Sequence, residues 1–86
     1  MTKRETLEAM GREDSVVFDN PEYDDAIIGV TEEGNVVYDY EKMINILAER
    51  DEMSRLEAAE FIDFNTVRAI PYAPDPKPII MYHLWE

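Results

Sequence analysis

The sequence predicts an α+β domain in which a small, mainly antiparallel sheet carries two helices on one face. Two runs rich in β-branched and aromatic residues flank a Glu-Glu-Gly turn at 32–34, which predicts a hairpin over 25–40. Helical spacing follows at 41–50 and 54–65, and strand formers return at 79–84. A chain of 86 residues suits a single domain over 1–86, with one modest core.

The chain begins with a stretch that favours a short helix over 2–11. Leu7 and Met10 lie one turn apart, and Gly11 is a candidate helix end. This apolar stripe is thin. We therefore expect residues 1–14 either to fray or to dock as a helix on a partner.

The hairpin is the most specific part of the prediction. Gly34 supplies the positive φ that a three-residue loop requires. With Thr31 opposite Asn35, the strands at 25–31 and 35–40 place one set of side chains on a common, buried face. That face consists of Ala26, Ile28, Val30, Val36, Tyr38 and Tyr40.

Two helices and a final strand complete the predicted fold. Residues 41–50 carry an apolar stripe, and Ser54 with Glu57 forms a capping box that starts a second helix at 54–65. Prolines make 71–78 a stiff, extended connection to the strand at 79–84. The side chains expected to face the core are Met43, Ile44 and Leu47 from the first helix and Leu56, Ala59 and Ile62 from the second. In the second helix, Ala58, Phe61 and Phe64 widen this apolar surface.

The charge balance indicates the kind of partner. The chain has 20 acidic and 8 basic residues, so its formal net charge is −12. This field opposes direct binding to nucleic acid or anionic lipid and favours a basic or nucleic-acid-binding protein. The sequence shows neither a secretory signal nor an apolar run near the length that spans a bilayer, so we expect a cytoplasmic protein.

The acidic residues are concentrated in one segment, 13–41, which holds ten carboxylates and no Lys or Arg. One interpretation is a docking surface, with two aromatic side chains that lack an evident core role as anchors. The other is a solvated face that only keeps the protein soluble. The residues of the candidate docking surface are Asp19, Glu22, Tyr23, Asp24, Asp25, Glu32, Glu33 and Trp85.

The residues needed for catalysis or for a cofactor are scarce. There is no cysteine, and His83 is the single histidine, which we expect to face solvent or a neighbouring hydrogen bond. The carboxylates at 19–25 lack the spacing of a calcium loop, and no phosphate-binding loop is present. We therefore expect a protein that is not an enzyme and needs neither metal nor cofactor.

Four segments resemble a family of short acidic proteins from phages and mobile elements of Firmicutes and related gut bacteria. They are residues 18–30, 36–40, 57–72 and 78–82. As that family has no assigned activity, the resemblance implies a context and transfers no site residue.

Together, charge and context predict a non-enzymatic accessory protein that binds and modulates a host protein. In one version the carboxylates of the docking surface stand in for phosphates, and the protein inhibits a nucleic-acid-binding or defence protein. The alternative is a self-associating structural protein, in which the strand at 79–84 pairs with a second copy to form a homodimer.

Overall fold

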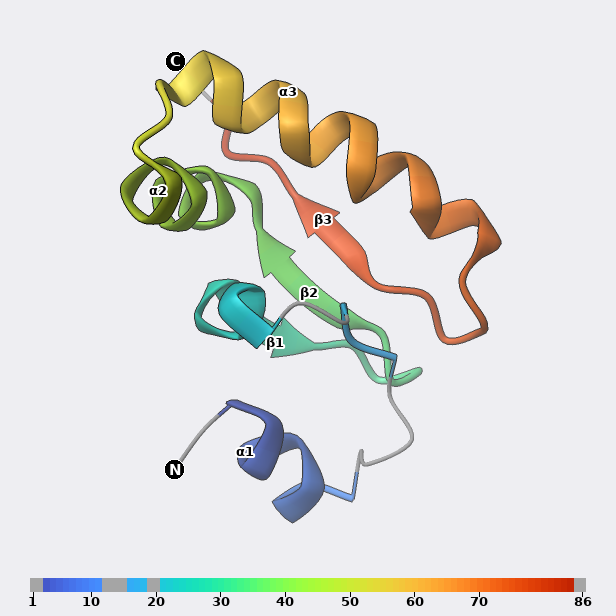
Figure 1. Ribbon diagram of the computed structural model, residues 1–86. Coiled ribbons are helices and arrows are strands. Elements are labelled where there is room, and N and C mark those ends of the chain that lie inside the picture. Colours follow the sequence, from blue (N-terminus) through green and yellow to red (C-terminus); the bar gives the residue numbers. More distant parts are fainter. Residues whose placement is uncertain (1–2, 12–15, 19–20, 85–86) are drawn as a thin grey trace.

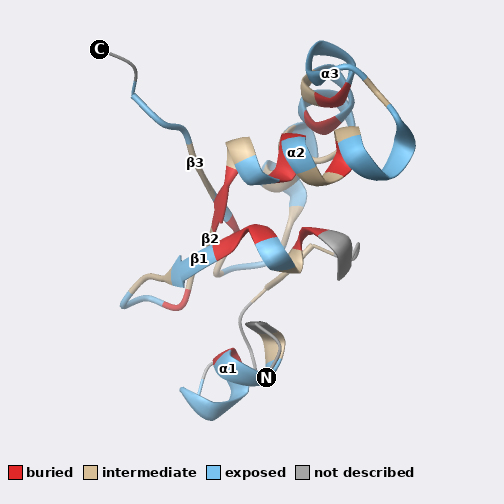
Figure 2. Ribbon diagram, turned by 90° about the vertical axis from the view of Figure 1, so that its left-hand side faces the viewer, coloured by how far each residue is buried: buried red, intermediate tan, exposed pale blue. Residues whose placement is uncertain are grey.

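The structure is a computed structural model that describes residues 3–11, 16–18 and 21–84. It is an α+β fold, as predicted, with α2 and α3 together on one side of the sheet (Figures 1 and 2). The elements, with two 3₁₀ helices written η, are α1 (Lys3–Ala9), η1 (Pro21–Ala26), β1 (Ile27–Val30), β2 (Val36–Asp39), α2 (Tyr40–Asp51), α3 (Arg55–Asn65), η2 (Val67–Tyr72) and β3 (Ile79–Met81).

The sheet is mixed, which corrects the expectation of a mainly antiparallel one. Its order is β1-β2-β3; β1 pairs with β2 antiparallel, whereas β3 pairs with β2 parallel. The reason is the connection: α2, α3 and η2 carry the chain from the end of β2 back to the level of its start, and such a crossover produces parallel neighbours. Asn35 Nδ2 donates to the Lys77 carbonyl at 2.9 Å, which holds the chain beside β2 just before β3 begins.

The predicted hairpin loop and the pairing of Val30 with Val36 are confirmed, but the predicted register farther from the loop is not. The Thr31 N–H donates to the Asn35 carbonyl at 2.8 Å, and Gly34 has φ 93°. Beyond Gly29 a β-bulge shifts the pairing, so that Ile27 instead of Ile28 lies opposite Tyr38. Ile27 is therefore buried and Ile28 is exposed, the reverse of the predicted faces.

Strand β2 ends at Asp39, one residue earlier than predicted. Tyr40 begins α2, because the Asp39 carboxylate caps that helix by accepting from the N–H groups of Glu41 and Lys42. Tyr40 therefore does not pair with Ala26, which lies in η1. The capping box of Ser54 and Glu57 is present as predicted and starts α3.

The core is built around Tyr38 of β2, which is fully buried. The buried stripe of α2, Met43, Ile44 and Leu47, agrees with the prediction. On α3 the buried residues are Ala58 and Ile62, whereas Leu56 is 71% exposed. The prediction for Leu56 was therefore wrong: the small Ala58 side chain allows close approach to α2, and this turns Leu56 outward.

The two ends of the chain also differ from the prediction. Helix α1 is present and docks on its own domain, because Leu7 is buried and the Arg4 guanidinium contacts both Asp24 and the Phe18 carbonyl. The proline-rich connection is shorter than 71–78, since η2 extends to Tyr72. The last strand covers only 79–81 of the predicted 79–84. Within the described part of the chain, no helix has the length and apolarity to cross a bilayer.

Candidate functional site

Among the residues that the structure describes, the predicted docking residues do not gather into one surface. Asp24 pairs with Arg4, with Nε to Oδ2 at 2.6 Å, so its charge is offset within the domain. Asp25 precedes β1, whereas Glu32 and Glu33 follow it, so these exposed residues lie at opposite ends of that strand. Asp19 and Trp85 lie outside the described residues, and of Glu22 only the backbone, in η1, is described.

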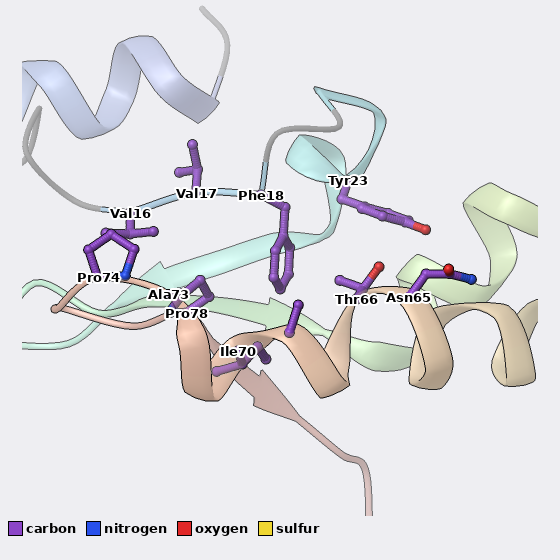
Figure 3. Close-up of a pocket in the computed structure, with 11 residues that line it drawn as sticks. Val16, Val17, Phe18, Tyr23, Asn65, Thr66, Ile70, Ala73, Pro74 and Pro78 are labelled. Carbon is purple, nitrogen blue, oxygen red and sulfur yellow. The ribbon is translucent and has the colours of Figure 1, made fainter.

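Tyr23 is not the surface anchor that the sequence suggested. It is 2% exposed and belongs to the core, which corrects its assignment to the docking surface. Figure 3 shows its ring beside an apolar cavity of about 400 Å³ between residues 16–18 and η2. Burial raises the pKa of the Tyr23 phenol. The phenol oxygen has no hydrogen-bond partner among the described residues.

This orphan oxygen leads to a stability prediction. Tyr23→Phe removes a buried polar atom that lacks a partner, so the free energy of unfolding should stay constant or rise by about 1 kcal/mol. Chemical denaturation of the purified variant measures this difference. A loss of about 1 kcal/mol or more would show that the oxygen is hydrogen-bonded in solution.

A histidine–carboxylate pair lies where the parallel strands β2 and β3 end. His83 Nε2 is 3.1 Å from both carboxylate oxygens of Asp39, which is 5% exposed. Desolvation raises the pKa of Asp39, but the hydrogen bonds from His83 and from the helix N–H groups, together with the charge of His83, lower it below its usual value. The Asp39 oxygens are occupied by structural hydrogen bonds, so the pair ties residues 82–84 to the start of α2.

Two tyrosines extend this connection towards α3. The rings of Tyr40 and Tyr82 are 4.7 Å apart between centroids, and the Tyr40 hydroxyl donates to Asp63 at 2.8 Å. Burial, followed by the hydrogen bond to Asp63, raises the pKa of Tyr40, and burial together with the Asp63 charge raises that of Tyr82. Tyr82 is thereby positioned beside the outer face of α3.

The outer face of α3 and Tyr82 enclose an open groove of about 920 Å³, which we call the α3 groove. Three aromatic side chains in it remain accessible: Phe61 is 43%, Phe64 69% and Tyr82 53% exposed. The Arg68 guanidinium carbon lies 5.1 Å from the centroid of the Phe64 ring. The lining residues are Met53, Glu57, Glu60, Phe61, Asp63, Phe64, Asn65, Val67, Arg68 and Tyr82.

Comparison with protein-family models, curated proteins and solved structures finds no match.

The groove combines apolar anchors with a negative rim. Tyr and Arg are among the residue types that dominate binding energy at protein interfaces, and Phe is enriched there as well. Exposed apolar clusters of this kind are typical of docking sites. Carboxylates of Glu57, Glu60 and Asp63 line the same groove. Among the described residues no group of three or more His, Cys, Asp or Glu side chains is arranged to hold a metal ion.

The sequence interpretation missed the α3 groove because it placed Leu56 on the buried side of the helix and treated Phe61 and Phe64 as a widening of that apolar surface, whereas both phenylalanines are exposed. The missed signal is the spacing of Glu57, Phe61 and Phe64, which share one face at i, i+4 and i+7. Asp39 directly before a helix is a preferred N-cap residue, and this could have moved the start of α2 to Tyr40.

Proposed function

We propose that this protein acts in the cytoplasm, without catalysis, as an acidic accessory domain that binds and modulates another protein. Its α3 groove receives a basic, amphipathic helix of the partner. One observation carries the proposal: Phe61, Phe64 and Tyr82 are exposed side by side in a groove that three carboxylates line. The resemblance to short acidic proteins of phages and mobile elements supports a host protein as the target.

The chemistry of the groove defines the partner. Apolar side chains of the partner helix would cover the two phenylalanines, and Lys or Arg beside them would approach Glu57 and Glu60. The net charge of −12 adds a long-range attraction for a basic chain, which speeds encounter at low salt. Residues on one helix face at i, i+3 and i+7 are the usual anchors in helix-in-groove recognition.

A synthetic peptide tests this proposal directly. The probe is a helix of about five turns with a leucine stripe flanked by lysines, and fluorescence anisotropy measures its dissociation constant. We expect the double substitution Phe61→Ser, Phe64→Ser to weaken binding by about 30-fold or more, because each residue acts as an anchor. Raising salt from about 0.1 M to about 0.5 M should weaken the wild-type complex as well.

Leu56→Ser is the matched control, since Leu56 is more exposed than either phenylalanine, lies on the same helix and does not line the groove. It should leave the dissociation constant within about twofold. Equal binding by the wild type and the double variant would contradict the proposed site.

The version in which carboxylates mimic phosphates makes a different prediction for the same measurement. It requires the carboxylates of Asp24, Asp25, Glu32 and Glu33, so charge reversal of these four residues to lysine would abolish binding. Under docking in the α3 groove, these four residues affect only long-range attraction, whereas Glu57→Lys, Glu60→Lys removes the rim itself. The two charge reversals therefore separate mimicry from groove binding.

A further inference from the structure

We infer that the α3 groove is also a two-fold interface for a second copy of this chain, so that the homodimer covers the surface offered to the basic partner. This inference rests on the proposed function, because it names a competitor for the same groove. The dimer contact then lies on α3, whereas the sequence predicted self-association through the strand at 79–84.

The groove carries a stripe of four residues whose charges are complementary to those of the same stripe in the reverse direction. Its members are Glu57, Phe61, Phe64 and Arg68, at spacings of four, three and four residues. Within α3, the spacing of Glu57, Phe61 and Phe64 is that of a heptad seam along which two helices pack, and Arg68 of η2 lines the same groove. The order acid, phenylalanine, phenylalanine, base is therefore self-complementary.

An antiparallel arrangement of two α3 helices uses that complementarity. The two-fold axis passes midway between Phe61 and Phe64. It places Phe61 of each copy opposite Phe64 of the other copy. The same operation places Glu57 opposite Arg68 at both ends of the seam. Arg68 already lies against the exposed face of Phe64, and this extends the stripe past the end of α3 at Asn65. A parallel arrangement would instead place like charges together.

The net charge gives this dimer an uncommon salt dependence. Each copy carries −12, so two copies repel one another over distances that salt screens. The dimer should therefore become tighter as salt rises from about 0.05 M to about 0.3 M, as long as apolar contact dominates the seam. A basic partner in the same groove responds in the opposite direction.

Two single charge reversals test the geometry by complementation, with analytical ultracentrifugation as the measurement. Glu57→Arg faces Arg68 of the second copy, and Arg68→Glu faces Glu57, so each variant alone should have a dimer dissociation constant about tenfold or more above wild type. An equimolar mixture of the two variants restores opposite charges at both ends of the seam. We expect the mixture to associate as tightly as the wild type.

Complementation in the mixture also shows that both variants are folded, which matters because Glu57 belongs to the capping box of α3. Glu57→Gln keeps that box and should weaken the dimer less than Glu57→Arg. A wild-type protein that stays monomeric at about 0.5 mM, or a mixture that associates no better than its components, would overturn the two-fold interface.

The peptide probe keeps this inference distinct from the proposed function. Arg68→Glu adds negative charge to the groove and frees it from the second copy, so it should bind the basic peptide at least as tightly as the wild type. If the peptide binds but the two charge variants do not complement each other, the proposed function stands and the dimer is overturned. If the variants complement each other but Phe61→Ser, Phe64→Ser leaves peptide binding unchanged, the dimer stands and the proposed function is overturned.

Discussion

Tyr38→Ala is expected to destabilise the protein by about 4 kcal/mol, which is a large part of the stability of a domain of this size. Tyr38 is fully buried in the central strand, and its ring centroid lies 4.5 Å from that of Phe18. Its hydroxyl oxygen accepts from the Phe18 N–H at 3.1 Å and so holds residues 16–18 against the sheet. The substitution removes the ring, leaves a cavity and frees that segment.

Urea denaturation followed by circular dichroism measures this change, and Tyr38→Phe is the matched control. The control keeps the ring and loses only the oxygen, so it should cost about 1 kcal/mol, in contrast to the neutral outcome expected for Tyr23→Phe. If the urea midpoint of unfolding is the same for Tyr38→Ala and the wild type, Tyr38 does not occupy the centre of the core.

The second large effect is expected at Asp39. Asp39→Ala removes the cap of α2 and leaves His83 without its carboxylate, and we expect a loss of about 2–3 kcal/mol at neutral pH. His83→Ala should cost less, because the two helix N–H groups still reach Asp39. An amide variant, Asp39→Asn, keeps an acceptor for those N–H groups. Its loss in the free energy of unfolding should lie between those of Asp39→Ala and His83→Ala.

The effect of Asp39 should depend on pH in a defined direction. Its pKa is lowered in the folded protein, so its contribution is complete above the unfolded pKa of about 4 and is lost as pH falls through the folded value. The difference in stability between wild type and Asp39→Ala should therefore shrink in this acidic range. A difference that stays constant from neutral pH to about pH 2.5 would contradict a charged Asp39 in the folded state.

Where the structure agrees with the sequence prediction, the signal was local. The loop at 32–34 needs a positive φ that Gly34 provides, and the Ser54–Glu57 box satisfies helix N–H groups within one turn. The stripe of Met43, Ile44 and Leu47 also follows from helical spacing alone. These features depend on residues a few positions apart, so sequence is enough to predict them.

Where prediction and structure differ, distant contacts decide. The bulge at Ile28 exchanges the two faces of β1, and close packing of Ala58 on α2 turns Leu56 to solvent. The parallel pairing of β3 depends on how far the crossover carries the chain. In each of these cases the alternative arrangements have similar local propensity, so the packing energy of the whole fold decides which one forms.

The candidate site depends on tertiary structure in the same way. Sequence alone determined the acidic charge, the absence of cysteine, the hairpin and the two principal helices, because these follow from composition and short-range spacing. Only the folded chain brought Tyr82 beside α3, placed His83 on Asp39 and buried Tyr23. The groove is formed by segments about twenty residues apart, and their meeting depends on which faces the core leaves exposed.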